Sequence, residues 1–146
     1  MIVAIASDHA GLSLKQWLLG ELQVEGVSLL DLGVDSPEPV DYPDIAVMLC
    51  NAILDGRAER GILLCGSGIG ASIAANKVRG IRAGVAHDTY SGHQGVEHDD
   101  MNVLCMGARV IGQEVALEIA CAYIQAKFTA EERHLRRVNK IKRLES

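Results

Sequence analysis

A cysteine that meets a glycine-rich turn is the most chemically informative feature of the sequence. Residues 61–70 read Gly-Ile-Leu-Leu-Cys-Gly-Ser-Gly-Ile-Gly. The apolar first half shows no alternation, which predicts a strand buried on both faces. Gly66, Gly68 and Gly70 then allow the backbone to turn sharply and leave its N–H groups uncovered. The small residues that follow predict a helix whose first N–H groups and positive dipole end face the turn.

Cys65 would lie at the mouth of this turn, where a helix N-terminus favours the thiolate form of cysteine. A base and an anion-binding site would then lie side by side. This pair suits a reaction in which a proton leaves carbon and negative charge develops on a neighbouring oxygen. Two other interpretations stay open: a buried cysteine often acts as a small core hydrophobe, and a glycine-rich turn can serve only to bind phosphate. The glycine spacing matches neither a P-loop nor the dinucleotide-binding fingerprint.

Further polar residues stand near the ends of the other apolar runs. Asp8 and His9 come directly after the first run, and Arg109 comes shortly after the last one. Asp8 could contact a substrate or simply cap the helix that follows it. His98 lies in a polar run before the last predicted strand, which we expect to be a short loop. Such a loop could bring a proton-transferring imidazole to the same edge of the sheet, although a loop histidine is often only solvated.

Arg133 and Arg137 are four positions apart and therefore share one face of a predicted helix. Two arginines on one face suit the bidentate recognition of a phosphate group, and the alternative is a solvated basic surface. A metal site built from His9, Cys65 and His98 lacks a recognised ligand arrangement, so we expect no metal.

Apolar runs and helical periodicities alternate along the whole chain. Alternation of this kind predicts a single α/β domain over residues 1–146, a three-layer α/β/α sandwich around a five-stranded parallel sheet, in the manner of Rossmann-like folds. Ligands of such sheets bind beyond the carboxyl ends of the strands, where most of the polar candidates fall. The predicted strands are residues 2–6, 27–32, 61–65, 81–87 and 102–106. The predicted helices are residues 12–24, 43–55, a helix after residue 70, and residues 89–95, 112–128 and 130–144.

Composition limits the class of protein. The chain has 146 residues, of which 49% are hydrophobic and 23% charged, as in an ordinary globular domain. Only 3% are aromatic and the net charge is −5, which argues against a nucleic-acid partner. The four cysteines form no C-x-x-C pair, and no signal peptide or membrane span is recognisable. We therefore expect a cytoplasmic protein with free thiols.

Six separate segments, in order along the chain, resemble the family of type B ribose-5-phosphate isomerases, which also contains the galactose-6-phosphate isomerase subunits. The segments are residues 7–11 (Ser-Asp-His-Ala-Gly), 41–43 (Asp-Tyr-Pro), 65–70, 73–77 (Ile-Ala-Ala-Asn-Lys), 107–112 (Gly-Ala-Arg-Val-Ile-Gly) and 133–138, which holds Arg-His and Arg-Val. The resemblance covers essentially the whole chain. It implies a five-stranded α/β/α sandwich that forms homodimers, acts on phosphorylated sugars and needs no metal or organic cofactor.

The resemblance also implies roles for individual residues. Cys65 matches the base that moves a proton between C1 and C2 of the sugar, and His98 matches the acid that opens the furanose ring. The backbone N–H groups that match the enediolate-stabilising loop belong to Gly66, Ser67, Gly68, Ile69 and Gly70.

Other matching residues would hold the substrate. Asp8 and Tyr42 match residues around the sugar, and Asp99 stands where the family usually has asparagine. The phosphate clamp is matched by His9, Arg109, Arg133 and Arg137, the last two reaching into the site of the partner subunit.

The resemblance implies an aldose–ketose isomerase, and we expect ribose 5-phosphate and ribulose 5-phosphate as its substrates. Asp99 leaves tetrose, allose or galactose phosphates open as alternatives. A nucleotide-binding regulatory module is a further alternative, because Asp31 lies near the end of the second strand like the ribose-binding acid of dinucleotide folds. The first turn, however, has no glycine fingerprint for a pyrophosphate.

Overall fold

Five strands form one parallel sheet in the computed structural model, which describes residues 1–145. The order across the sheet is β2-β1-β3-β5-β4, and each neighbouring pair is parallel. The strands are β1 (Ile2–Ser7), β2 (Ser28–Asp31), β3 (Arg60–Cys65), β4 (Ala83–Val85) and β5 (Val103–Gly107). Because all strands run the same way, their carboxyl ends share one edge, which confirms the parallel sheet predicted from the sequence.

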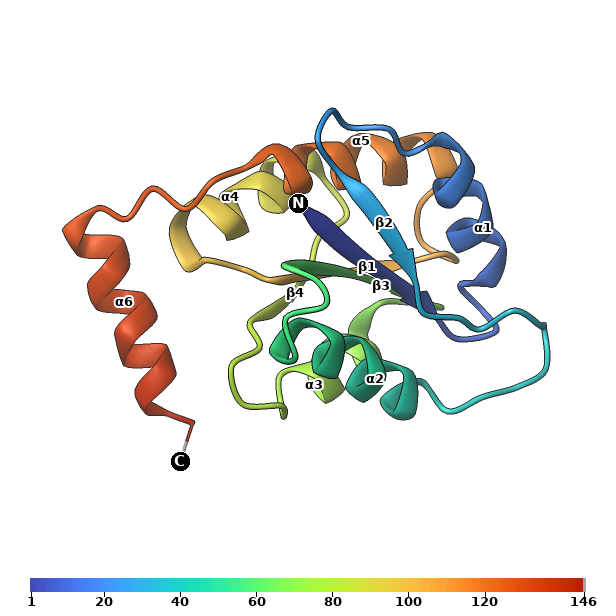
Figure 1. Ribbon diagram of the computed structural model, residues 1–146, viewed down its shortest axis with the longest axis horizontal. Helices are drawn as coiled ribbons and strands as arrows, with labels where there is room; N and C mark the ends of the chain where they lie inside the picture. The colour runs from blue at the N-terminus through green and yellow to red at the C-terminus, as the bar shows by residue number, and fades with distance from the viewer. Residues whose placement is uncertain (146) are drawn as a thin grey trace.

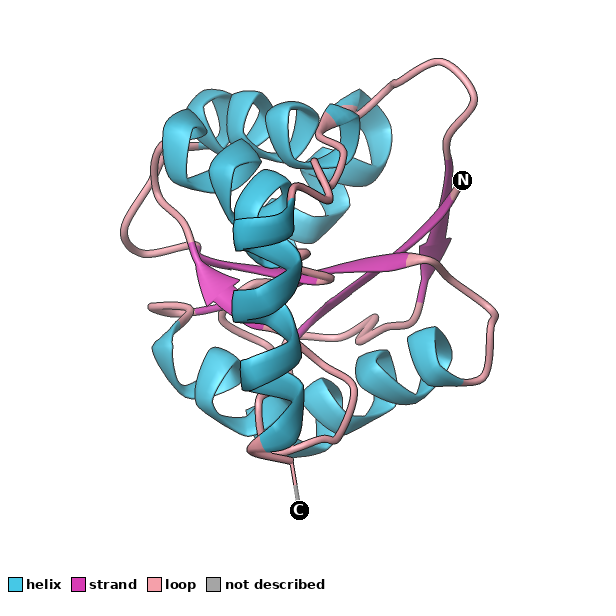
Figure 2. Cartoon of the chain, turned by 90° about the vertical axis from the view of Figure 1, so that its left-hand side faces the viewer, coloured by secondary structure: helices cyan, strands magenta, loops and turns pink. Residues whose placement is uncertain are grey.

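Helices cover both faces of this sheet (Figure 1). On one face lie α1 (Leu12–Glu21), α4 (Thr89–Asp99) and α5 (Gln113–Gln125), and on the other lie α2 (Tyr42–Leu54) and α3 (Ile69–Ala75). The last helix, α6 (Glu132–Arg143), belongs to neither layer. It stands in front of the sheet and runs from one helical layer to the level of the other (Figure 2). The result is the predicted three-layer sandwich with one helix outside it.

Two apolar cores explain why the central strands do not alternate in polarity. In β1, Val3 and Ile5 pack towards α1 and α5, whereas Ala4 and Ala6 pack towards α2 and α3. A strand with helices on both faces must be apolar at every position. The chain places β2 on one side of β1 and β3 on the other. The gap between β1 and β3 is therefore the switch point at which parallel sheets bind ligands.

An ion pair ties the edge strand β2 to α1. The ammonium of Lys15, almost fully buried, lies 2.5 Å from a carboxylate oxygen of Asp31. The backbone N–H of Gly33 donates to the same oxygen. Burial raises the pKa of Asp31, but the hydrogen bonds from Lys15 and Gly33 outweigh burial and hold that pKa below its ordinary value. Asp31 is therefore engaged within the fold, which weakens its likeness to a ribose-binding acid.

The structure differs from the predicted elements mainly around β4 and α4. The strand predicted at residues 81–87 is shortened to β4, and the helix predicted to end at residue 95 continues to Asp99. Gly92 and Gly95 mark a helix end in the sequence, yet both lie inside α4. Each packs closely, because an added Cβ would lie 3.2 Å from the side chain of Ile119 at Gly92 and 3.0 Å from that of Met101 at Gly95. Tight packing overrides their low helix propensity.

Candidate active site

Cys65 is the last residue of β3 and its thiol is nearly buried. The backbone N–H of Gly68 donates a hydrogen bond to its Sγ at 3.1 Å. Gly68 has a φ of 82°, in the left-handed region, and an added Cβ there would lie 3.1 Å from the backbone of Met106. Only glycine fits this turn without strain. The turn therefore brings a backbone N–H group onto the sulfur.

A cavity of about 310 Å³ opens beside this thiol. It lies at the carboxyl edge of the sheet, between the loops that follow β1, β3 and β5. Its walls combine a thiol, a carboxylate, a phenol and a guanidinium. The lining residues are Asp8, Tyr42, Cys65, Gly66, Ser67, Gly70, Arg109 and Val110. The structure thus brings together seven residues singled out in the sequence, and it adds Val110, which lies in the segment 107–112 quoted above.

The turn after β5 is docked directly on the cysteine loop. The N–H of Ala108 donates to the carbonyl of Cys65 at 2.8 Å, and the N–H of Arg109 donates to the carbonyl of Gly66 at 3.0 Å. An added Cβ at Gly66 would lie 3.4 Å from Nη1 of Arg109. The guanidinium therefore lies over the glycine turn, where it can meet an anionic group of a bound molecule.

The first turn of the chain forms the opposite wall of the cavity. The Oδ1 atom of Asp8 accepts hydrogen bonds from the N–H groups of Ala10 and Gly11, at 3.0 and 3.1 Å. Asp8 thus stabilises the local turn and also lines the cavity. His9 accepts a hydrogen bond on Nδ1 from the N–H of Val40 at 3.2 Å. The proton of its neutral ring is therefore on Nε2.

The predicted residues on α4 and α6 lie outside the cysteine cavity. The position expected for His98 is wrong. His98 is not in a loop at the carboxyl edge but in the last turn of α4, next to Asp99. A helix that follows a parallel strand runs back towards the start of the next strand. Its last turn therefore lies at the amino edge of the sheet, whereas Cys65 lies at the carboxyl edge. Arg133 and Arg137 on α6 also lie outside the cysteine cavity.

Asp99 lines a second cavity, of about 660 Å³, between α6 and the body of the molecule. Its walls include Asn76 and Lys77, which follow α3 at the end away from Cys65. The two cavities thus lie at opposite ends of α3. A single chain holds its cysteine in one place and its His98 and Asp99 in another.

His98 belongs to a histidine cluster on α4 and α6. Its ring stacks on the ring of His134, with centroids 4.1 Å apart and planes 24° from parallel. The side-chain nitrogen of Gln94 lies 2.9 Å from Nδ1 of His98. The hydroxyl oxygen Oγ1 of Thr129 lies 2.6 Å from Nδ1 of His134, and the side chain of His134 is almost fully buried. Burial, and after it the neighbours His98 and Arg133, lower the pKa of His134.

His134 and Gln94 are not among the functional residues predicted from the sequence. Gln94 and His98 have the i, i+4 spacing of neighbours on a helix, and this signal is readable only if α4 extends to Asp99.

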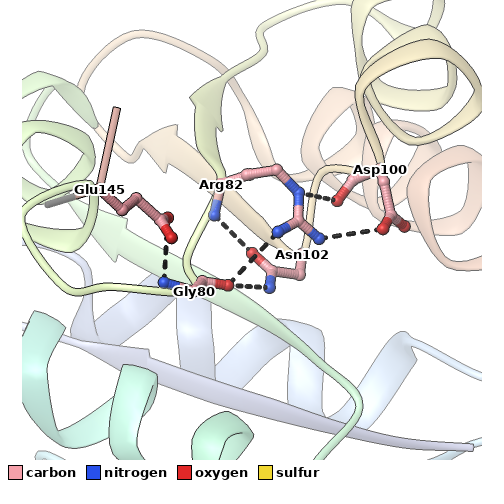
Figure 3. A network of polar contacts seen from close by, with 5 residues as sticks. All are labelled: Gly80, Arg82, Asp100, Asn102 and Glu145. Atoms are coloured by element: carbon pink, nitrogen blue, oxygen red, sulfur yellow. Dashed lines mark hydrogen bonds and ion pairs between the residues drawn. The ribbon is translucent and has the colours of Figure 1, made fainter. Parts of the chain in front are cut away.

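A polar network holds the end of α4 in place (Figure 3). Asp100 ends the helix with a φ of 51° in the left-handed region. The guanidinium of Arg82 donates to the carbonyl of Asp100 at 2.8 Å and pairs with its carboxylate at 3.0 Å. Asn102 connects the backbone of Arg82 to the carbonyl of Gly80. His98 and Asp99 therefore project from a fixed helix end.

Within residues 1–145, no group of three or more His, Cys, Asp or Glu side chains is arranged to hold a metal ion. Across the same residues, no helix has the length and apolar character needed to cross a membrane.

Comparisons with known proteins agree on one family. The model of a family described as Ribose/Galactose Isomerase matches residues 3–141. A D-erythrulose-4-phosphate isomerase of Pectobacterium atrosepticum is 46% identical over 86% of this chain and 84% of its own. Ribose-5-phosphate isomerase B of Escherichia coli is 41% identical over 98% of this chain and 95% of its own. The solved structure of ribose-5-phosphate isomerase B from Clostridium thermocellum is 42% identical and superimposes with a TM-score of 0.94, covering 99% of this chain and 97% of that one.

Proposed function

Because the chain belongs to the ribose/galactose isomerase family, we propose that it is an aldose–ketose isomerase that interconverts ribose 5-phosphate and ribulose 5-phosphate. The observation that carries the proposal is the cavity beside Cys65. It places a nearly buried thiol, a carboxylate, a phenol and a guanidinium around one space large enough for a small sugar phosphate. The full-length similarity to ribose-5-phosphate isomerases B supports the choice of a pentose.

The chemistry we propose is proton transfer through an enediolate. The thiolate of Cys65 takes the proton from C2 of the open-chain aldose, and the electron pair of that bond forms a double bond between C1 and C2. Negative charge develops on O1, and the N–H groups of residues 66–70 stabilise it. The thiol then returns the proton to C1, and one proton passes from O2 to O1. Asp8 and Tyr42 bind the sugar hydroxyls, and His9 and Arg109 bind the phosphate.

We infer that a second copy of the chain completes each site in a homodimer. In one chain, the end of α4 lies at the opposite edge of the sheet from Cys65, so His98 cannot act on a sugar bound beside its own cysteine. His98 and Asp99 would enter the partner's cavity together with Arg133 and Arg137 from α6. The stacked rings of His98 and His134 connect α4 to α6, the two helices that would supply these groups.

Replacing Cys65 by alanine tests the base. The Cys65→Ala variant should lose isomerisation by about 10²–10⁴-fold, because the general base is gone, while it still binds the sugar phosphate. Incubation in heavy water, followed by NMR, measures both the product and the exchange of the substrate C–H proton. Near-parental turnover by Cys65→Ala would exclude this residue as the base.

Mixing two inactive variants tests the shared site. In a homodimer of Cys65→Ala chains, or of Arg137→Ala chains, both sites lack a required residue. In a mixed dimer with shared sites, one site holds both intact residues, so activity should return. Mixed dimers that form and stay inactive would show that Arg137 does not serve the partner's cysteine.

A second candidate substrate is a tetrose phosphate. The relative from Pectobacterium atrosepticum, at 46% identity, is named for D-erythrulose 4-phosphate. Asp99, where the family usually has asparagine, would be the residue that shifts the preference. Measuring kcat/KM on tetrose, pentose and hexose phosphates decides between these substrates.

A further inference from the structure

The side chain of Gln94 fixes where His98 carries its proton. Gln94 lies one turn before His98 on α4, and its amide nitrogen is 2.9 Å from Nδ1 of the histidine. An amide nitrogen can only donate a hydrogen bond, so Nδ1 must be the acceptor. The ring is then neutral, and its single proton is on Nε2. His98 therefore presents an N–H donor on the side away from Gln94.

The ring of His134, on which His98 stacks, is held by a hydrogen bond with Thr129. Thr129 has one hydroxyl proton, and its Oγ1 donates to the carbonyl of Glu97 at 3.0 Å. The contact of 2.6 Å between Oγ1 and Nδ1 of His134 must therefore be a donation from the histidine. Nδ1 of His134 therefore carries a proton. The buried face of this ring forms a rigid platform on which the ring of His98 stacks.

We propose that Gln94 is a positioning residue that makes His98 a neutral N–H donor for opening the sugar ring. The inference rests on the proposed function, in which His98 acts on the furanose form of the substrate. The Nε2 proton of His98 passes to the ring oxygen O4 as the C1–O4 bond breaks, and the proton on O1 passes to Nε2 as the aldehyde forms. The histidine ends as it began, and no other reactant is needed.

The amide of Gln94 assists this exchange electrostatically. While Nε2 gives up its proton, negative charge develops on the imidazole ring. A donor on Nδ1 stabilises that charge and makes the Nε2 proton easier to transfer. A neutral imidazole acting as an N–H donor has a precedent in enzymes that form enediolates.

Two variants of the same size separate this role from simple packing. Gln94→Leu removes the donor, and Gln94→Glu replaces it with an acceptor that draws the proton onto Nδ1. Gln94 is partly exposed, so neither change should disturb the fold. The position of the proton on His98 is read directly from the ¹⁵N shifts and ring couplings of the histidines. Comparison with the spectrum of His98→Asn assigns the signals.

The parental protein should show a proton on Nε2 of His98, and Gln94→Glu should move it to Nδ1. A parental proton on Nδ1 would overturn the inference. This measurement does not depend on activity. It therefore tests whether Gln94 fixes the proton on His98 even if the substrate is a different sugar phosphate.

Activity gives the second readout, because one substrate of the pair needs no ring opening. Ribulose 5-phosphate cannot form a furanose ring, since its O5 atom carries the phosphate. Gln94→Leu and Gln94→Glu should lower kcat for ribose 5-phosphate about tenfold, with little change in KM. Deuterium incorporation at C1 of ribulose 5-phosphate should stay within about twofold of the parental rate.

Three outcomes count against the inference or its premise. Parental conversion of ribose 5-phosphate by both variants would overturn the role of Gln94. An equal loss in conversion and in C1 exchange would also overturn it, because the defect would not be in ring opening. If the parental protein converts no ribose 5-phosphate while the proton is found on Nε2, the substrate assignment fails and the positioning by Gln94 stands.

Discussion

Replacing Gly70 by alanine would place a methyl group where the ring of Tyr42 now lies. A Cβ built on Gly70 is 2.5 Å from Cζ of Tyr42 and 2.8 Å from its hydroxyl oxygen. These distances are too short for any real contact, so one group must move. The backbone of α3 packs against both α2 and the sheet, whereas Tyr42 is exposed at the first position of α2. The tyrosine ring therefore swings out of the cavity.

The size of the effect follows from what Tyr42 does in the proposed site. Loss of one hydrogen bond to a sugar hydroxyl costs about 1 kcal/mol, which lowers kcat/KM about fivefold. The fold should not suffer in the same way, because alanine is favoured over glycine inside a helix by about 0.5–1 kcal/mol. Displacing the ring of Tyr42 offsets part of this gain in stability. We therefore expect weaker catalysis in a protein that unfolds at the parental urea concentration or slightly above it.

Gly20→Ala is the matched control, because Gly20 lies in α1 with no atom within 4 Å of a built Cβ. It should stabilise the protein by about 0.5–1 kcal/mol and leave kcat/KM unchanged. Adding Gly70→Ala to Tyr42→Phe should cost little more than Tyr42→Phe alone, since the hydroxyl is already lost. Parental kcat/KM in the Gly70→Ala variant would refute the reasoning and remove Tyr42 from the substrate contacts.

Three further predictions concern charge. Burial holds the pKa of His134 below its ordinary value of 6.5, so the folded protein binds fewer protons than the unfolded chain around and below that pH. The free energy of unfolding, measured in urea, should therefore fall as the pH drops through this range, and His134→Gln should flatten the dependence. Asp31→Asn leaves the buried ammonium of Lys15 without its anion and should cost about 1–3 kcal/mol, and adding Lys15→Met should recover part of the loss. Asp99→Asn should change the ranking of kcat/KM among tetrose, pentose and hexose phosphates, because an ionised aspartate only accepts hydrogen bonds; an unchanged ranking would mean that Asp99 does not touch the substrate.

The sheet could be predicted because its central strands must be apolar at every position. β1, β3 and β5 are buried on both faces, and no helix period fits their short apolar runs. The same rule brings Asp8, Cys65 and Arg109 together, since each lies at or just beyond the carboxyl end of a parallel strand. Tyr42 comes from the start of α2, and its place in the cavity follows from a close fit against Gly70, which the sequence does not reveal.

The position of His98 could not be predicted because it depends on where α4 ends. Gly95 suggests a helix end, and a loop from there could have reached the carboxyl edge. In the structure the side chain of Met101 packs against Gly95, and the helix continues for another turn. That extra turn moves His98 to the amino edge of the sheet. Met101 lies only six residues after Gly95, and its N–H donates to the carbonyl of Gly95 at 3.1 Å, so this contact belongs to the local motif that ends the helix. Asp100, and not the glycine that usually marks such an end, takes the left-handed position there, so the sequence pattern favours Gly95 as the end.

In the proposed homodimer, the exposed position of α6 would link catalysis to protein concentration. The buried residues of this helix are His134 and Val138, whereas Leu135, Ile141 and Leu144 are exposed. In a lone chain, such a helix would open locally at a small free-energy cost and exchange its amide hydrogens early. Contact with a second copy would bury those apolar side chains and suppress the opening by mass action. Dilution would then detach the two arginines from the site before the rest of the molecule unfolds.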